Sequence, residues 1–269
     1  MSEAAMVRSA DGTLLSVKRL GQGPPLVLVH GTALDRRCWS ALVPGLAGQF
    51  TLHLLDRRGR RGSASRDDTT GGDYDIRREG EDVAAVVEAA GRDVHLVGHS
   101  YGALCSLEAA LITDAIGRMI LYEPPAPTPG HPVIPPDVLD RLHTLAAAGE
   151  AEAMLETFAR QILAPADFAA IKTPPIWQAS LDNASTIMRE ARCVTAFDTS
   201  DRLSGIAVPV RFLLGTESPA YHRPAIEAIA AGLHQTELTL LHGQAHLAIS
   251  HDPRQVAAAI LAPPATSQP

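Results

Sequence analysis

The sequence predicts an α/β fold in which a mostly parallel central sheet is flanked by helices and carries an inserted helical cap. Three observations support this prediction. Short unbroken apolar runs such as 26–29 are typical of strands that are covered on both faces. These runs alternate with longer helical stretches, an order that favours parallel strands joined by helices. One interval, 124–205, lacks a convincing strand and interrupts the alternation.

The predicted elements follow one another from the N-terminus. Segment 14–19 alternates apolar and polar residues, which indicates an early edge strand. The unbroken apolar run 26–29 indicates a further strand, and the mainly apolar segments 51–55, 94–97, 119–122, 210–214 and 237–241 are interpreted in the same way. The helical stretches between them are 35–47, 75–90, 101–113, 223–233 and 253–261.

The interval 124–205 begins with a proline-rich stretch and continues into segments with helical patterns at about 137–148, 150–163 and 175–190. A crossover between parallel strands typically needs a dozen or so residues, so ~80 residues are more than a connection requires. We therefore predict a helical cap at 124–205, inserted into a core formed by 1–123 and 206–269. An ordinary long crossover is the alternative.

Composition and charge narrow the possible function classes. With 269 residues, 46% of them hydrophobic, the chain can form one large domain with a substantial core. Its formal net charge of −7 disfavours nucleic acid as the main partner. We expect no membrane association, because the N-terminal residues lack a signal-peptide pattern and no stretch reaches the ~18 apolar residues of a membrane span. A small-molecule substrate is the expected partner, and the sequence leaves a homodimer open.

The cysteines indicate the cellular compartment. Cys38, Cys105 and Cys193 are odd in number, widely spaced and free of any CxxC pattern. A disulfide framework is therefore not expected, and a reducing cytoplasm is the simplest location. No residue cluster has metal-ligand spacing and no phosphate-binding G-x-x-x-x-G-K sequence occurs, so we expect neither a metal nor a cofactor.

The most informative motif is G-x-S-x-G at residues 98–102. It follows the apolar run 94–97 and precedes an Ala/Leu-rich helical stretch. A serine on a sharp strand-to-helix turn needs neighbours without side chains two residues away, and Gly98 and Gly102 meet that demand. The turn would raise the hydroxyl of Ser100 above the sheet edge, so Ser100 is a candidate nucleophile.

The motifs together resemble those of the α/β-hydrolase superfamily, and the resemblance covers the core on both sides of the interval 124–205. The matching segments are Val29-His-Gly-Thr32, Asp56-Arg-Arg-Gly-Arg-Arg-Gly-Ser63, Tyr74-Asp-Ile with Asp82-Val-Ala-Ala, and the serine turn. One departure occurs, because the second glycine of the family's D-x-R-G-x-G-x-S turn falls at Arg61, with Gly62 shifted by one. We expect a changed loop there.

The resemblance implies an oxyanion hole and a general base. The backbone N–H groups of Thr32 and Tyr101 would stabilise the charged oxygen of a tetrahedral intermediate. His30 would brace the loop that carries Thr32, and His99 is interpreted as a packing residue. The family places its histidine three residues after a glycine, which fits His246 and not its neighbours at 242 and 251.

The resemblance also implies a third catalytic residue, an acid that orients His246 and completes a triad with Ser100. The position of this acid is the unusual part of the sequence. In most of the family it is an Asp three residues after the glycine that ends strand 210–214, but that count reaches Ser218 here. Glu123 follows the strand 119–122, whose carboxyl end opens on the same sheet edge as Ser100. Certain dehalogenases and the zearalenone lactonases carry their acid after this strand. We predict Glu123 as the acid, with Glu217 as the alternative.

Two further groups of residues are candidates for binding a ligand. Trp177 and Met188 are candidates for lining a substrate pocket. The arginines of the turn at 57–61 could bind an anion, but we interpret them as a solvated turn.

The resemblance implies a serine hydrolase that cleaves a small carboxylic ester or a lactone through an acyl-enzyme. A C–C hydrolase, lyase or cyclase using the same triad is a second hypothesis. A ligand-binding protein with slow turnover is a third, since a fold does not determine a function. The intact nucleophile, base and oxyanion loop favour an enzyme.

Overall fold

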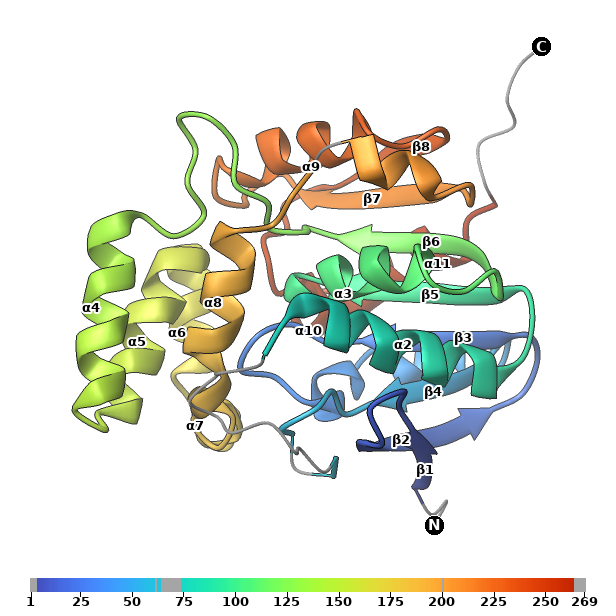
Figure 1. The fold of residues 1–269 in the computed structure, drawn as a ribbon, viewed down its shortest axis with the longest axis horizontal. Helices are drawn as coiled ribbons and strands as arrows, with labels where there is room; N and C mark the ends of the chain where they lie inside the picture. Colours follow the sequence, from blue (N-terminus) through green and yellow to red (C-terminus); the bar gives the residue numbers. More distant parts are fainter. Residues whose placement is uncertain (1–3, 61, 64–73, 200, 264–269) are drawn as a thin grey trace.

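An eight-stranded sheet forms the centre of the molecule, with strand order β1-β2-β4-β3-β5-β6-β7-β8 (Figure 1). The computed structural model describes residues 4–60, 62–63, 74–199 and 201–263. Strand β2 is antiparallel to both its neighbours, and all strand pairs from β4 across to β8 are parallel. The predicted fold class is thereby confirmed. The strands are β1 (Ala5–Arg8), β2 (Leu14–Gly21), β3 (Pro25–Val29), β4 (Thr51–Leu55), β5 (Val94–His99), β6 (Ile116–Tyr122), β7 (Val210–Gly215) and β8 (Thr236–Leu241).

Both faces of the sheet are covered, which explains the unbroken apolar runs. Successive side chains of a strand point to opposite faces. In β3, Val27 and Val29 pack into one hydrophobic cluster, whereas Leu26 and Leu28 pack into a second. A strand that is buried on both sides has no position for a polar residue, so it shows no alternation.

Helices α2 (Ile76–Ala90), α3 (Tyr101–Ala110) and α9 (His222–Ala230) cover the first of these faces, and α2 and α3 lie in front of the sheet in Figure 1. The other face is covered by η1 (Arg36–Trp39), α1 (Val43–Leu46), α10 (Ala248–His251) and α11 (Pro253–Leu261). None of the helices in the described part of the chain has the length and apolar character needed to cross a bilayer.

The segment between β6 and β7 forms a layer of its own. It holds α4 (Pro136–Ala147), α5 (Ala151–Ile162), α6 (Pro165–Ile171), α7 (Ile176–Leu181), η2 (Ala184–Thr186), α8 (Ile187–Thr195) and η3 (Asp201–Gly205). In Figure 1, α4 to α8 stand at the end of the sheet toward which β6 and β7 point. The carboxyl ends of the parallel strands therefore face these helices.

Several element boundaries differ from the sequence-based expectation. The stretch 35–47 is not one helix but the two short helices η1 and α1, because the prolyl and glycyl residues at 44 and 45 are poor helix interior residues. The stretch 175–190 is divided into α7, η2 and α8, and α6 and β1 were not predicted. These short elements carry too few residues for a clear periodicity.

Candidate active site

Ser100 lies on the turn between β5 and α3, as the G-x-S-x-G motif predicts. Its backbone has φ 54° and ψ −127°, a region that L-residues rarely adopt. The backbone N–H of Ser100 donates to the carbonyl of Tyr122 at 2.8 Å, which ties the turn to β6. Such a conformation persists only where the surrounding structure holds it, and it is typical of functional sites.

The two glycines of the motif allow this turn to pack. A Cβ atom on Gly102 would lie 2.3 Å from the carbonyl oxygen of Val29 and 2.5 Å from that of His30. A Cβ on Gly98 would lie 2.5 Å from Cα of Ala103. Both contacts are with backbone, which cannot move aside. The glycines therefore let the serine turn press against the loop that follows β3.

That loop contains the predicted oxyanion donor Thr32. Thr32 and Gly31 line the same cavity as Ser100. His30 is fully buried, its Nε2 accepts the backbone N–H of Arg57 at 3.2 Å, and its Nδ1 donates to the carbonyl of Gly31 at 3.0 Å. Burial holds the pKa of His30 well below its usual value, so the ring is neutral. These contacts join His30 to two segments of backbone and leave it away from any reacting atom.

The second predicted oxyanion donor, Tyr101, is the first residue of α3 and follows Ser100 directly. The intrahelical hydrogen bonds of an α-helix leave its first N–H groups without partners, and the helix dipole favours negative charge there. The side chain of Tyr101 is buried, with its hydroxyl 3.0 Å from that of Tyr74.

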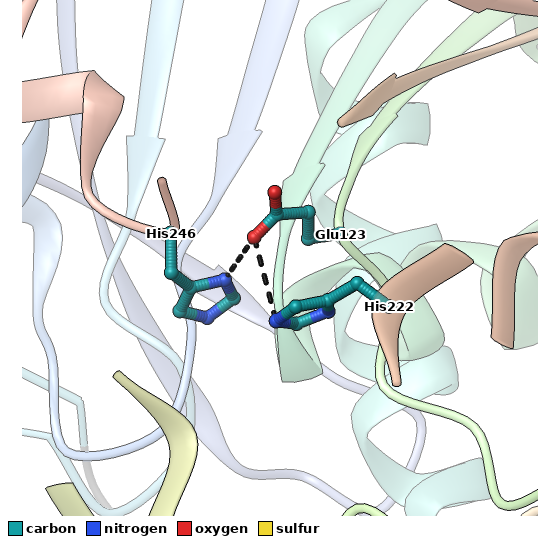
Figure 2. Close-up of side chains that lie close together, drawn as sticks. All are labelled: Glu123, His222 and His246. Atoms are coloured by element: carbon teal, nitrogen blue, oxygen red, sulfur yellow. Dashed lines mark hydrogen bonds and ion pairs between the residues drawn. The ribbon is translucent and has the colours of Figure 1, made fainter. Parts of the chain in front are cut away.

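His246 and Glu123 are in direct contact. Nδ1 of His246 lies 2.6 Å from Oε2 of Glu123, and both side chains are buried (Figure 2). Nδ1 therefore donates to the carboxylate, and the other ring nitrogen carries the lone pair. His246 also lines the cavity that Ser100 lines. The structure thus brings together three residues that are far apart in the sequence.

The carboxylate of Glu123 has further donors. Its Oε1 accepts the backbone N–H of Gly215 at 2.8 Å and the hydroxyl of Ser218 at 2.5 Å. Burial raises the pKa of Glu123, but His222, His246 and Ser218 lower it more strongly, and the pKa falls to about 2. Glu123 is therefore an anion at neutral pH.

The alternative acid, Glu217, does not share this environment. Its side chain is exposed, and its carboxylate accepts a hydrogen bond from Thr216 at 3.4 Å. The loop after β7 instead directs Ser218 toward Glu123, because Ser218 is the residue that follows the glycine by three positions. His242 and His251 are exposed as well, and His251 pairs with Asp167 at 3.1 Å.

His99 contacts both the backbone and the ring of His246. Its Nε2 donates to the backbone carbonyl of His246 at 2.9 Å, and the two rings lie 4.6 Å apart. Burial lowers the pKa of His99 to about 3, so it stays neutral. The packing interpretation omitted this hydrogen bond, which depends on a contact across 147 positions of sequence.

Sequence reasoning missed three polar residues around this cluster, the partly buried Ser218 and the buried His222 and Asp167. Asp167 of α6 accepts the backbone N–H of Leu247, next to the predicted base, at 3.0 Å. Nε2 of His222 lies 3.4 Å from Oε2 of Glu123. The available signal for Ser218 was its place three residues after Gly215, where the family has its acid; no local motif marks the other two.

The cavity above Ser100 has a volume of about 50 Å³ and a mostly apolar lining. Trp177 and Met188 are not part of this lining. Trp177 packs against Phe168 and donates its Nε1–H to Glu152, and Met188 lines a separate cavity together with His143. The apolar wall consists of Ala33, Leu34, Leu155, Phe158, Ala159, Ile162, Leu163, Ile171 and Leu247. A single sequence does not reveal which side of each short helix faces the sheet edge.

The interpretation of the arginine turn as solvated is wrong. Arg57, Arg58 and Arg60 are at most 2% exposed. Arg57 pairs with Glu79 of α2 at 2.8 Å and with Glu190 of α8 at 2.9 Å. The burial comes from α2 and α8, which cover the turn and bring carboxylates from distant sequence positions. Arg61 lies outside the described residues.

In the described part of the chain, one cluster has the donor types of a metal site, namely Glu123, His222 and His246. The two imidazole rings are stacked at an angle of 20° between their planes. A metal ion lies close to the plane of each imidazole that binds it, since the nitrogen lone pair lies in that plane. Two nearly parallel rings do not meet this demand, so the arrangement fits a hydrogen-bonded cluster better than a metal site.

The fold, an eight-stranded mostly parallel sheet flanked by helices, is that of an α/β-hydrolase. The chain belongs to the Alpha/beta hydrolase family, whose sequence profile matches residues 26–259. An alpha/beta hydrolase of known structure from Sphaerobacter thermophilus DSM 20745 is 31% identical, with a TM-score of 0.81 over 95% of this chain and 98% of that one. The esterase RhEst1 from Rhodococcus sp. ECU1013 is 25% identical, with a TM-score of 0.72 over 97% of each chain.

Curated relatives match a shorter part of the chain. The pimeloyl-(acyl-carrier protein) methyl ester esterase of Aeromonas hydrophila is 36% identical over 97 residues. The counterpart from Aeromonas salmonicida is 37% identical over 97 residues. In both cases the match spans 36% of the relative, about a third of its length.

Proposed function

We propose that this protein is a serine esterase that hydrolyses small apolar carboxylic esters, lactones among them, through an acyl-enzyme. One observation carries the proposal: the 2.6 Å hydrogen bond between Glu123 and His246 is formed beside the cavity that Ser100 lines. A carboxylate that holds an imidazole next to a serine hydroxyl is the arrangement of a nucleophilic triad.

In the proposed mechanism, Oγ of Ser100 attacks the ester carbonyl carbon while Nε2 of His246 accepts the hydroxyl proton. Glu123 orients the ring through Nδ1 and stabilises the imidazolium. The N–H groups of Thr32 and Tyr101 hold the oxyanion, and the loss of one such donor typically costs ~2.7–4 kcal/mol.

The same groups complete the turnover. The intermediate collapses by breaking the bond to the alcohol oxygen, and His246 returns the proton to that alcohol. Water then attacks the acyl-enzyme with His246 as base, and the carboxylic acid leaves. Every proton passes through His246, so one base suffices for both half-reactions.

Residues 124–205 serve in this proposal as a cap over the core formed by 1–123 and 206–269. Four of its residues on α5, Leu155, Phe158, Ala159 and Ile162, contribute to the wall of the cavity. A small, largely apolar cavity favours a compact apolar acyl or alcohol group and excludes bulk water from the acyl-enzyme. The esterase names of RhEst1 and of the curated relatives support ester hydrolysis over the alternative reactions.

A fluorophosphonate probe together with p-nitrophenyl acetate and butyrate tests the proposal. We expect stoichiometric labelling at Ser100, detected by peptide mass spectrometry, and ester turnover that Ser100→Ala abolishes. Folded protein that is neither labelled nor active would contradict an esterase and favour a binding protein. Labelling without turnover of any ester would favour a different reaction of the same triad.

A further inference from the structure

His222 is a buried histidine that the triad mechanism does not use. It is the first residue of α9, just after the loop that follows β7, and its exposed fraction is 0%. Its ring lies between two others, 4.2 Å from the ring of Tyr221 and 4.8 Å from that of His246. Figure 2 shows Nε2 of His222 and Nδ1 of His246 pointing at the same carboxylate oxygen of Glu123.

The protonation state of His222 follows from its surroundings. Burial lowers the pKa of His222 to about 3, so the ring is neutral at pH 7 and carries one proton. A lone pair on Nε2 would face the anionic oxygen of Glu123 at 3.4 Å and be repelled by it. The proton therefore belongs on Nε2, where the N–H points toward the carboxylate.

The geometry of this contact is loose. At 3.4 Å, Nε2 is farther from Oε2 than Nδ1 of His246 is, and neither ring nitrogen of His222 makes a regular hydrogen bond to the residues that the structure describes. A buried N–H without a good acceptor is costly, unless a nearby charge compensates it. The carboxylate of Glu123 is that charge, and its attraction acts over this distance in the low-dielectric interior, where both side chains are buried.

We propose that His222 is a positioning residue, which acts on His246 through Glu123 and by direct stacking. Its N–H shares the negative charge on Oε2 with the N–H of His246. Its ring covers one face of the His246 ring at an angle of 20° and restricts the rotation that would separate Nδ1 from the carboxylate. This role depends on the proposed triad, in which His246 is the base.

The direction of the effect on His246 follows from the shared charge. A carboxylate that receives a second N–H stabilises an adjacent imidazolium less strongly. His222 therefore favours the neutral form of His246, which is the form that can accept a proton from Ser100. Removal of the N–H at position 222 leaves more charge on Oε2, so His246 should stay protonated up to a higher pH.

The other titratable groups that face Glu123, His222 and His246 do not reproduce the effect of His222 on the protonation of His246. Burial lowers the pKa of His99 to about 3 and raises the pKa of Tyr122 and of Tyr221, so all three are neutral at assay pH. Burial also raises the pKa of Asp167 on α6, while His251 opposes that shift. Asp167 accepts the backbone N–H of Leu247 and pairs with His251. A substitution at position 222 alters neither of these contacts.

His222→Phe and His222→Gln separate the N–H from the packing. Phenylalanine keeps a stacked ring without a donor, whereas glutamine offers an amide N–H near the position of Nε2. In His222→Phe we expect kcat to fall about tenfold with KM within about twofold, and the acid limb of kcat/KM to move up by about half a pH unit. His222→Gln should keep the wild-type limb but lose part of kcat, because it removes the ring that stacks on His246. Tyr221→Phe, which alters the opposite neighbour, should leave the limb unchanged.

NMR titration of the His246 imidazole in wild type, His222→Phe and His222→Gln provides a readout that needs no substrate. We expect the midpoint to move to higher pH in the Phe variant only. Equal midpoints in all three folded proteins would overturn the proposal, even if the esterase function holds. If His222→Phe does not fold, His222→Met, which also lacks the N–H, takes its place: a midpoint above that of His222→Gln supports the inference, and equal midpoints contradict it. Wild-type protein that shows neither probe labelling at Ser100 nor ester turnover refutes the triad instead.

Discussion

At the scale of single residues, the carboxylate that contacts His246 follows β6, and a serine stands where most of the family has an acid. Glu123 adopts φ 47°, in the left-handed region, at the end of β6. This turn directs its side chain across the carboxyl edge of the sheet toward the loop after β7. Gly215 and Ser218 of that loop donate to Oε1, which leaves Oε2 for His246. The β7 loop therefore supports the carboxylate that it does not itself supply.

Glu123→Gln and Glu217→Gln rank the two candidate acids. Gln at 123 keeps the volume but removes the charge that stabilises the imidazolium, so kcat/KM for p-nitrophenyl butyrate should fall at least ~100-fold. Gln at 217 changes an exposed side chain and should alter kcat/KM by less than about twofold. The assay is run at equal folded concentration, verified by circular dichroism. The reverse order of losses would refute Glu123 as the acid.

A second residue-scale prediction moves the acid between loops. Asparagine tolerates a positive φ better than most residues, so Glu123→Asn removes the carboxylate with little backbone strain. Addition of Ser218→Asp places a carboxylate on the loop that already reaches this site. We expect the double variant to regain at least about tenfold in kcat over Glu123→Asn alone. Ser218→Asp in the wild-type background is the control, and it should reduce activity because two carboxylates then face each other.

At the scale of elements, α8 is joined to the core by buried charges. Glu190 of α8 accepts from Arg57 at 2.9 Å and from Arg60 at 2.6 Å, and Arg189 donates to the carbonyl of Arg58 at 2.9 Å. Burial raises the pKa of Glu190, but Arg57, Arg60 and Arg189 lower it more strongly. The pKa of Glu190 therefore falls to about 2. The arginine turn thus links α2, α8 and the loop that contains His30.

Glu190→Gln should destabilise the protein by about 3–5 kcal/mol at pH 7, because it leaves buried guanidinium groups without their counter-charge. The folded-state pKa of Glu190 is depressed, so its stabilising contribution is complete above the unfolded value of 4.5 and is lost as pH falls toward about 2. The difference in free energy of unfolding between variant and wild type should therefore shrink between about pH 5 and pH 2. Urea denaturation at several pH values measures it.

The matched control for this prediction is Glu81→Gln, which breaks the more exposed pair with Arg78. Such surface pairs contribute about 0–1 kcal/mol, so this variant should remain close to wild type. A small loss of stability in Glu190→Gln, similar to that of the control, would show that the buried pairs add nothing beyond surface charge.

At the scale of the whole molecule, the cavity exists only because two separate parts of the chain meet. Its polar floor comes from the sheet edge, with Ser100 and His246, and most of its apolar wall comes from α5 and the residues after it. Asp167 of α6 joins the two sides, since it accepts from the backbone N–H of Leu247 beside the base. The position of these helices therefore determines both the size of the cavity and the placement of the loop that carries His246.

Ala159→Phe tests whether this wall selects the substrate. The added ring would occupy part of the cavity, so we expect kcat/KM for p-nitrophenyl hexanoate to fall at least about tenfold relative to that for acetate. Ala169→Phe places the same ring on an exposed position of α6 and should leave the ratio unchanged. An unchanged ratio in both variants would mean that the substrate binds elsewhere.

Much of the core could be predicted from local patterns. The apolar runs located β3 to β8, and G-x-S-x-G located the turn at Ser100, because strand burial and a tight turn constrain residues that are neighbours in the sequence. The sequence ranked Glu123 above Glu217 through the family resemblance alone, and the fold shows which of the two contacts His246. Glu123 and Glu217 both follow a parallel strand, and nothing local determines which side chain turns inward.

The sequence by itself determined the class of fold, the strand order along the chain and the residues around the serine turn, since short-range periodicity and sterics encode them. The tertiary structure alone decided that Glu123 contacts His246, that the arginines of the turn at 57–60 are buried, and that Trp177 and Met188 lie outside the cavity. Each of these depends on segments up to 133 positions apart coming together. Such contacts result from the packing of whole elements, which no local pattern records.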